Sequence, residues 1–476
     1  MAINIGTRLE PLWDDTILDP AKTTAELRRF SPVKREKVME FGEPWEGDGC
    51  DYFNFLCDNG LWRMYYLAWK ITEDGYVPSR HEIRVCYAES RDGLHWEKPS
   101  LGLCEFNGSK ENNILLDEHT QKFDNFFVFI DQNPDCPPES RFKAVTGDHG
   151  ASGAYLRAYE SSDGIHFTPG SMISNEDYYD TLNTAFYDTE QRQYVAYVRG
   201  FHDGGFGSGV RDIRRLTSPD FVDWTSSRQI TFSDELDVPL YTNVISPYYR
   251  APHVYIGFPS RYIERKAWTK NYDRLCGKEM RRRRMEASAR YGLALTDCVF
   301  ITSRDGAHFT RYQDAFLRPG AENGRNWVYG DCYPAYGMLE TPSADRGAAS
   351  ELSMFVFENH WQGIPTELYR YTNRIDGFAG LSVGSSPKVA VTKPLVFAGG
   401  ELVLNFATSA RGSLFVTIED AEGNRLESGE LFGDSVERVV DFDGDLSAFA
   451  GKPVTIRFTM EECDLFSLRF AAQTKE

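Results

Sequence analysis

The sequence predicts an all-β protein, with a five-bladed β-propeller followed by a C-terminal β-sandwich. The first observation behind this prediction is a turn pattern that occurs five times, with 71, 57, 85 and 71 residues between successive aspartates. The second is the sequence between the copies, where short β-branched and aromatic stretches alternate with turn residues. Repeats at such intervals, each with several strands, are typical of propeller blades.

The repeated turn consists of Ser-x-Asp-Gly and an aromatic residue three positions after the glycine. Aspartate can accept hydrogen bonds from the backbone two residues further on, and glycine supplies the positive φ of a tight turn. In a propeller this turn joins the third strand of a blade to the fourth, so we expect its Asp and His side chains to be structural. The complete copies are Ser90–Trp96, Ser161–Phe167 and Ser303–Phe309, a weaker copy is Ser218–Trp224, and a fragment is Asp376–Phe378.

Three strand-like stretches precede each copy of the turn and form the predicted blades. In blade one they are residues 51–56, 61–69 and 82–89, and in blade two they are 125–130, 141–146 and 154–159. Blade three has 183–188, 193–199 and 213–217, blade four has 242–248, 252–258 and 298–302, and blade five has 333–340, 352–358 and 367–371.

The pattern changes near residue 380, so we expect a propeller domain over 1–380 and a β-sandwich over 381–476. Evenly spaced strand-like stretches lie at 394–397, 401–408, 413–419, 436–442, 454–459 and 465–470, with Gly, Asn, Asp and Pro between them. Tryptophan is absent from this part of the sequence. A stabilising accessory module is therefore favoured over a carbohydrate-binding one.

One basic segment interrupts blade four. Residues 261–290 contain 11 Lys and Arg against four Asp and Glu, and β-branched residues are few, so we expect a helical insertion over about 262–290. Two interpretations stay open for it. One is a solvated helix packed on the outside, and the other is a lid or a contact between two copies of the chain.

Composition excludes several classes of protein. The net charge of −19 repels phosphate, which argues against nucleic acid as a partner. A mean hydropathy of −0.46 and the lack of a long apolar run argue against a membrane protein. The nine cysteines are scattered without paired C-x-x-C motifs, and no secretory leader opens the sequence. We therefore expect reduced thiols, a cytoplasmic location, and no metal or cofactor site.

Propeller geometry predicts where chemistry can occur. The residues just before each first strand, and the loops between second and third strands, lie on the face opposite the repeated turns. Four carboxylates on this face are our candidate catalytic residues: Asp51, Asp124 and Asp180 before the first strands of blades one to three, and Glu358 after an apolar strand. Glycoside cleavage uses one carboxylic acid and one carboxylate, and crowded carboxylates raise one another's pKa.

Other polar and aromatic side chains on the same face are candidates for substrate binding, because sugars need hydrogen-bond partners and flat apolar surfaces. These candidates are His149, Arg199, Asn243, Arg261, Trp327, Asp331, His360 and Trp361.

Several strings resemble those of a known group of enzymes. They include Pro44–Gly47, Tyr87–Gly93, Val210–Arg215, Tyr241–Asn243, Gly257–Tyr262 and Arg318–Gly320. The chain resembles five-bladed-propeller glycoside hydrolases of the furanosidase type, the group that includes families 32, 43, 68 and 130, and more narrowly a bacterial set labelled family-32-like. The nucleophile motif of family 32 is not in this sequence, so roles carry over by blade position. The resemblance implies a base or nucleophile at Asp51, a stabilising Asp124 and an acid at Asp180.

These observations together predict a glycoside hydrolase that acts on a small oligosaccharide or glycoside by carboxylate catalysis, without a cofactor. Two alternatives stay open. In a glycoside phosphorylase of the family-130 type, phosphate would replace water in a cationic pocket, for which Arg199, Arg214, Arg215 and Arg261 are candidates. The second alternative is a sugar-binding propeller without catalysis.

Overall fold

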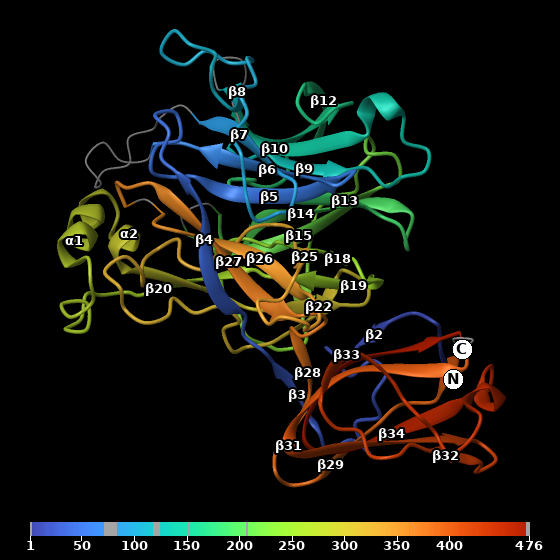
Figure 1. Ribbon diagram of the computed structural model, residues 1–476. Coiled ribbons are helices and arrows are strands. Elements are labelled where there is room, and N and C mark those ends of the chain that lie inside the picture. The colour runs from blue at the N-terminus through green and yellow to red at the C-terminus, as the bar shows by residue number, and fades with distance from the viewer. Residues whose placement is uncertain are drawn as a thin grey trace.

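The computed structural model describes residues 2–70, 83–117, 124–150, 153–205, 208–360 and 362–472, and these residues are almost entirely β-structure. Five sheets form the blades of a propeller, and a ten-stranded sheet forms a β-sandwich at one end of the molecule (Figure 1). The predicted fold class, a five-bladed propeller followed by a sandwich, is confirmed.

The first three blades are four-stranded antiparallel sheets whose strands follow one another along the chain. Blade one contains β5 (Asp51–Asp58), β6 (Leu61–Ala68), β7 (Arg84–Ser90) and β8 (Ile114–Asp117). Blade two contains β9 (Phe127–Ile130), β10 (Phe142–Gly150), β11 (Gly153–Ser161) and β12 (Thr168–Ser174), with the short 3₁₀ helix η1 (Pro138–Ser140) before β10. Blade three contains β13 (Thr184–Asp188), β14 (Gln193–His202), β15 (Val210–Ser218) and β16 (Arg228–Gln229).

The last two blades depart from this order. Blade four contains β18 (Ser246–Tyr248), β19 (Ala251–Gly257), β22 (Ile301–Ser303) and β23 (His308–Arg311), and β17 (Thr231–Phe232) adds to its outer edge. Blade five contains β24 (Tyr333–Pro334), β25 (Leu339–Thr341), β26 (Glu351–Glu358) and β27 (Thr366–Arg374). Its outermost strand is β4 (Val33–Phe41) from the N-terminal part of the chain, so the first and last parts of the propeller are joined by strand pairing.

The repeated turns are structural, as predicted. In blade two, the Ser161 hydroxyl accepts the Gly164 N–H at 3.0 Å, and Asp163 accepts the N–H groups of Ile165 and His166 at 2.8 Å. Gly164 has a φ of +76°, and the hydroxyl of Tyr65 in blade one donates to its carbonyl at 2.8 Å. The turn therefore completes its own hydrogen bonds and packs against the preceding blade.

The fifth turn is used differently, because it joins the propeller to the sandwich. Asp376 is fully buried. It accepts hydrogen bonds from Tyr248 at 2.6 Å and Arg250 at 3.1 Å in blade four. It also accepts a hydrogen bond at 2.8 Å from Ser467, which belongs to the sandwich.

The sandwich is built on two long strands, β31 (Glu401–Asp420) and β34 (Val454–Ala471), which pair along their length with a register break between Thr408 and Ser413. The N-terminal residues also belong to this sheet, because β1, β2 and β3 pair with C-terminal strands. The other strands are β1 (Ile3–Gly6), β2 (Glu10–Pro11), β3 (Glu26–Arg29), β28 (Ala379–Val383), β29 (Lys388–Val391), β30 (Leu395–Phe397), β32 (Arg425–Glu427) and β33 (Asp434–Val439), and η2 (Leu446–Phe449) is a short 3₁₀ helix.

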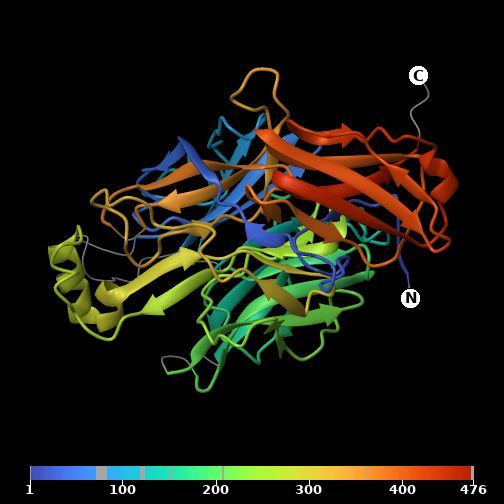
Figure 2. The same ribbon diagram turned by 90° about the horizontal axis from the view of Figure 1, so that it is seen from below.

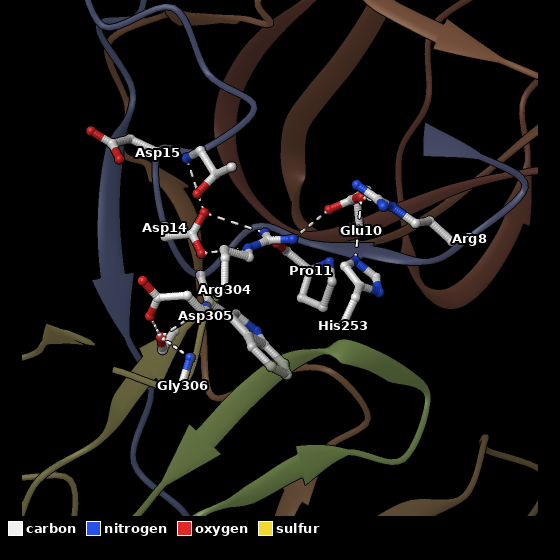
Figure 3. A network of polar contacts seen from close by, with 12 residues as sticks. Arg8, Glu10, Pro11, Asp14, Asp15, His253, Arg304, Asp305 and Gly306 are labelled. Atoms are coloured by element: carbon white, nitrogen blue, oxygen red, sulfur yellow. Dashed lines mark hydrogen bonds and ion pairs between the residues drawn. The ribbon is translucent and has the colours of Figure 1, made fainter. Parts of the chain in front are cut away.

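A polar network also ties blade four to the N-terminal segment (Figure 3). Arg304, from the turn of blade four, donates to Glu10 at 2.7 Å and to Asp14 at 2.8 Å. Burial alone would raise the pKa of Glu10, but His253, Arg304 and Arg8 together lower it to about 2. The sandwich and the N-terminal segment thus contact turns of blades four and five, on the face opposite the predicted site.

The basic segment extends from blade four away from the sandwich (Figure 2). It begins with a hairpin of β20 (Ser260–Glu264) and β21 (Ala294–Cys298), and between them lie α1 (Lys278–Ala287) and α2 (Ala289–Leu293). The helices occupy residues 278–293, whereas the sequence predicts a helical insertion over about 262–290. No helix in the described part of the chain is long and apolar enough to cross a membrane. All nine cysteines are free thiols, as expected.

Candidate active site

The backbone has an unusual conformation where the first strands begin. Tyr52, Tyr179, Val244 and Cys332 all have positive φ, between +46° and +58°. This conformation is uncommon for residues other than glycine, and it is a clear outlier for a β-branched valine. Such strain is held in place by surrounding structure and is concentrated at functional sites, so it draws attention to this end of the propeller.

Asp51 is the most unusual carboxylate in this region. It is the first residue of β5, it is only 2% exposed, and its Oδ1 has no hydrogen-bond partner among the described residues. Burial raises the pKa of Asp51 well above its ordinary value, and the negative charge of the half-buried Asp124 raises it further. Asp51 therefore keeps its proton at a pH at which ordinary aspartates are ionised.

Asp180 lies in the opposite electrostatic setting. Its Oδ1 is 2.9 Å from Nη1 of Arg199, a fully buried side chain on β14. Arg199 also donates to the backbone carbonyl of Tyr241, and its guanidinium lies 4.0 Å from the centre of the Tyr241 ring. This ion pair fixes the position of the Asp180 side chain.

Tyrosines connect these groups into one cluster. The buried hydroxyl of Tyr52 interacts electrostatically with Asp51, Asp124, Arg199 and Tyr241, and its pKa is raised well above the ordinary value, mainly by burial. The cluster therefore contains the predicted residues Asp51, Asp124, Asp180 and Arg199 from three blades. Tyr52 and Tyr241 complete it.

Glu358 lies apart from this cluster. It forms an ion pair with Lys34 of β4, and with Asp331 it lines a cavity of about 30 Å³ in blade five. Burial is the main cause that raises the pKa of Asp331 to about 7, and Glu358 adds to it. Two of our predicted residues thus share a second, smaller site.

Two predicted binding residues have their polar groups occupied within the fold. The Asn243 side chain accepts from Thr184 and donates to the carbonyls of Leu182 and Tyr197, so it links blades three and four. Arg261 forms a two-point ion pair with Asp297 across the β20–β21 hairpin, at 2.7 and 2.6 Å.

Two of the remaining predicted residues have side chains in the described part of the chain. Trp327 lines a hollow of about 690 Å³ beside the insertion, and its indole donates to the carbonyl of Gly320 at 2.9 Å. His360 is buried against Tyr329, Tyr333 and Phe357, and burial lowers its pKa to about 3. The side chain of His149 and all of Trp361 lie outside the described residues.

Three residues beside the cluster are not among the site residues that the sequence predicts: Tyr241, Tyr262 and Arg211. The reason is strand geometry. Adjacent residues of a strand point to opposite faces, so Arg261 turns toward Asp297, whereas Tyr262 turns toward Arg211. The alternation of side chains along a strand is the signal that separates these two faces.

One group of side chains offers a geometry that could hold a metal ion. Ligand atoms of His202, Asp203 and Asp237 lie within 4.8 Å of one another. Both aspartates are exposed, and His202 already contacts Asp237 at 3.1 Å and Asp212 at 3.2 Å. These contacts explain the group as a surface hydrogen-bond network.

Comparisons with known proteins support no more than the fold. No protein-family model matches the sequence, and no curated protein matches it either. Solved structures that are similar to it include a glycoside hydrolase family 43 arabinoxylan arabinofuranohydrolase from Bacillus subtilis, which is 13% identical, with 90% of this chain and 96% of that chain covered and a TM-score of 0.41.

Two further structures show how varied the similar proteins are. A fructofuranosidase from Schwanniomyces occidentalis is 9% identical, with 96% of this chain and 100% of that chain covered and a TM-score of 0.39. An N-acetylgalactosamine deacetylase from F. plautii is 13% identical, with 78% and 96% covered and a TM-score of 0.40. The reaction is argued from the site itself.

Proposed function

We propose that the chain is a glycoside hydrolase whose acid and base are carboxylates at the first-strand starts of blades one to three. The observation that carries this proposal is the presence of two unlike carboxyl groups in one cluster. Asp51 is buried and has no oppositely charged partner among the described residues, whereas Asp180 is paired with Arg199. Glycosidic bond cleavage requires one group that donates a proton and one that attacks or activates water.

The electrostatics support specific roles for the two groups. Asp51 retains its proton because burial and Asp124 raise its pKa, which suits a general acid for the leaving oxygen. Asp180, positioned by its ion pair with Arg199, suits a base or nucleophile. This order is the reverse of the one implied by the resemblance, where blade one supplies the base.

The phosphorylase alternative receives less support from the four arginines predicted for it, because each has a partner within the fold. Arg199 contacts Asp180, and Arg261 contacts Asp297. Arg214 contacts Asp212 at 3.1 Å, and Arg215 contacts Gln191 at 3.1 Å.

A glycoside panel tests the proposal. Purified protein would be incubated with aryl furanosides, aryl pyranosides and plant oligosaccharides, with and without phosphate, and the products would be separated by chromatography. We expect hydrolysis of at least one substrate, and a fall in kcat/KM of about a thousandfold or more in Asp51→Asn and Asp180→Asn. Asp163→Asn, in a turn on the other face, is the matched control and should keep its activity.

Three outcomes would contradict the proposal. Full activity of both variants would exclude these carboxylates, phosphate-dependent product would indicate a phosphorylase, and calorimetric sugar binding without product would indicate a binding protein. The domain division at residue 380, a contact between copies through the basic insertion, and a cytoplasmic location stay proposals. The nine free thiols support the last of them.

A further inference from the structure

Arg211 is a buried arginine whose charge has no partner among the described residues. It lies on β15 and is 9% exposed, and the described residues form no hydrogen bond or ion pair with its side chain. Other buried arginines differ in this respect. Arg199, Arg311 and Arg370 each contact a carboxylate, and Arg281 donates to the carbonyls of Cys276 and Trp327.

Aromatic rings surround the Arg211 guanidinium instead. Its central carbon lies 4.7 Å from the ring centre of Tyr262, 5.6 Å from that of Phe201 and 5.7 Å from that of Tyr241. Cation–π contacts stabilise a charge by less than the cost of removing an ion from water. The rings therefore compensate for only part of the desolvation of Arg211.

Two hydroxyl groups around Arg211 are also unsatisfied. The buried Oη atoms of Tyr262 and Tyr333 have no hydrogen-bond partner among the described residues. Burial raises the pKa of Tyr262 to about 12, so this hydroxyl carries a proton that it can donate. Tyr333 stacks on Tyr241 with ring centres 5.3 Å apart. Three donors, on Arg211, Tyr262 and Tyr333, thus surround the Tyr241 ring. None of them has an acceptor among the described residues.

The position of Arg211 connects it to the candidate active site. Arg199 and Arg211 both contact the ring of Tyr241, but Arg199 is occupied by Asp180. Arg290 adds a second positive charge near Tyr262, against one negative charge from Glu264. The side chains around Tyr262 therefore carry more positive than negative charge, although the net charge of the protein is −19.

We propose that Arg211, with the hydroxyls of Tyr262 and Tyr333, forms an oxyanion-binding subsite of the active site. Guanidinium and hydroxyl donors suit a carboxylate or phosphate group, since charged hydrogen bonds to such oxygens are short and strong. The oxyanion is the carboxylate of an acidic sugar or inorganic phosphate. Its role as a substrate subsite rests on the proposed hydrolase function, but its affinity for oxyanions does not.

Binding measurements without turnover test this subsite directly. Isothermal titration calorimetry at constant ionic strength would compare glucuronate and galacturonate with glucose and galactose, and would include inorganic phosphate, sulfate and acetate. We expect wild type to bind at least one oxyanion about tenfold or more tightly than any neutral sugar. Arg211→Met should lose this preference by about ten- to a hundredfold, and Tyr262→Phe by a smaller factor.

Matched variants keep the test specific. Arg215→Met is the control, because Arg215 lies four residues further along β15 but contacts Gln191, and it should bind oxyanions as wild type does. Arg211→Lys should retain part of the affinity. Arg211→Met should also melt at or above the wild-type temperature, because it removes a buried charge that the fold leaves unpaired. Tyr262→Phe serves if Arg211→Met fails to fold.

The outcomes distinguish an acidic sugar from inorganic phosphate, and they distinguish the subsite proposal from the hydrolase proposal. Arg211-dependent binding of a uronate alone identifies an acidic sugar, and Arg211-dependent binding of phosphate identifies the inorganic ion. Asp51→Asn should keep the oxyanion preference, so loss of hydrolysis does not affect this measurement. The proposal is overturned if no oxyanion binds better than the neutral sugars, or if Arg211→Met binds oxyanions as wild type does.

Discussion

Asp163 and Asp51 lie on opposite faces of the propeller and differ in nearly every physical respect. Asp163 is about half exposed and accepts hydrogen bonds from two backbone N–H groups, a serine hydroxyl and a histidine ring, all within five residues. Asp51 is buried, and its Oδ1 has no partner among the described residues. Their pKa values move in opposite directions. Burial would raise the pKa of Asp163, but its hydrogen bonds lower it, whereas burial and Asp124 raise that of Asp51.

This difference shows how to separate structural from functional carboxylates in a repeat protein. An aspartate that is satisfied by its own turn stabilises that turn in every blade where it occurs. A buried carboxyl without a local partner destabilises the fold, so its presence calls for another explanation, which function can supply. The predictions below test this distinction, beginning with the largest expected effect.

Arg199→Met should have the largest effect, because it leaves Asp180 without its counter-charge in a buried setting. We expect kcat/KM to fall by about a thousandfold and the free energy of unfolding by roughly 3–5 kcal/mol. Arg199→Lys should restore part of both losses. An unchanged kcat/KM in Arg199→Met would show that the ion pair between Arg199 and Asp180 is not required for turnover.

Asp376→Ala should be the most damaging substitution in the repeated turns. This aspartate is buried at the joint and contacts Arg250, Tyr248 and Ser467, so its loss leaves a buried charge without its partner. We expect the free energy of unfolding to fall by about 3 kcal/mol in urea denaturation. Asp163→Ala, its exposed equivalent in blade two, should lose only about 1 kcal/mol. Equal losses would mean that the joint contributes nothing beyond the turn.

The propeller could be predicted from the sequence, because the same short turn sequence recurs from blade to blade. The serine, aspartate and glycine of every complete copy form the turn that their residue types predict. The pairing of β4 with blade five, and of β1 to β3 with the sandwich, could not be predicted. These contacts join residues more than 300 positions apart, and no local sequence pattern indicates them.

The site could be predicted only in part, for a related reason. Asp51, Asp124 and Asp180 precede the first strands of blades whose positions follow from the repeat, so blade geometry brings them together. Glu358 is the last residue of β26, and it forms an ion pair with Lys34 of β4. The sequence does not predict that β4 belongs to blade five. Arg261 pairs with Asp297, and the next residue, Tyr262, contacts Arg211, because successive residues of a strand face opposite sides.

Asp305→Ala should have a modest effect that depends on pH. The side chain is more than half exposed, so we expect a loss of only about 1 kcal/mol at neutral pH, after allowing for screening by solvent. Burial would raise the pKa of Asp305, but the N–H groups of His308 and Ala307 outweigh it and lower the pKa to about 2. The stabilisation is therefore present above about pH 4, the ordinary pKa of aspartate, and is lost as the pH falls toward 2. Thermal melts of both proteins should converge over that interval, and a constant difference would contradict the hydrogen-bond explanation.

Asp51→Asn should produce the smallest change in stability, and in the opposite direction. Because the folded state binds the Asp51 proton more tightly than the unfolded chain does, wild-type stability falls as the pH rises above about 4. Asparagine carries no charge at any pH, so the variant avoids this loss, and its advantage in melting temperature should be larger at pH 8 than at pH 5. We expect a gain of about 1 kcal/mol, set against a large loss of turnover. A variant that is less stable than wild type at pH 8 would show that Asp51 is a structural carboxylate after all, like those of the turns.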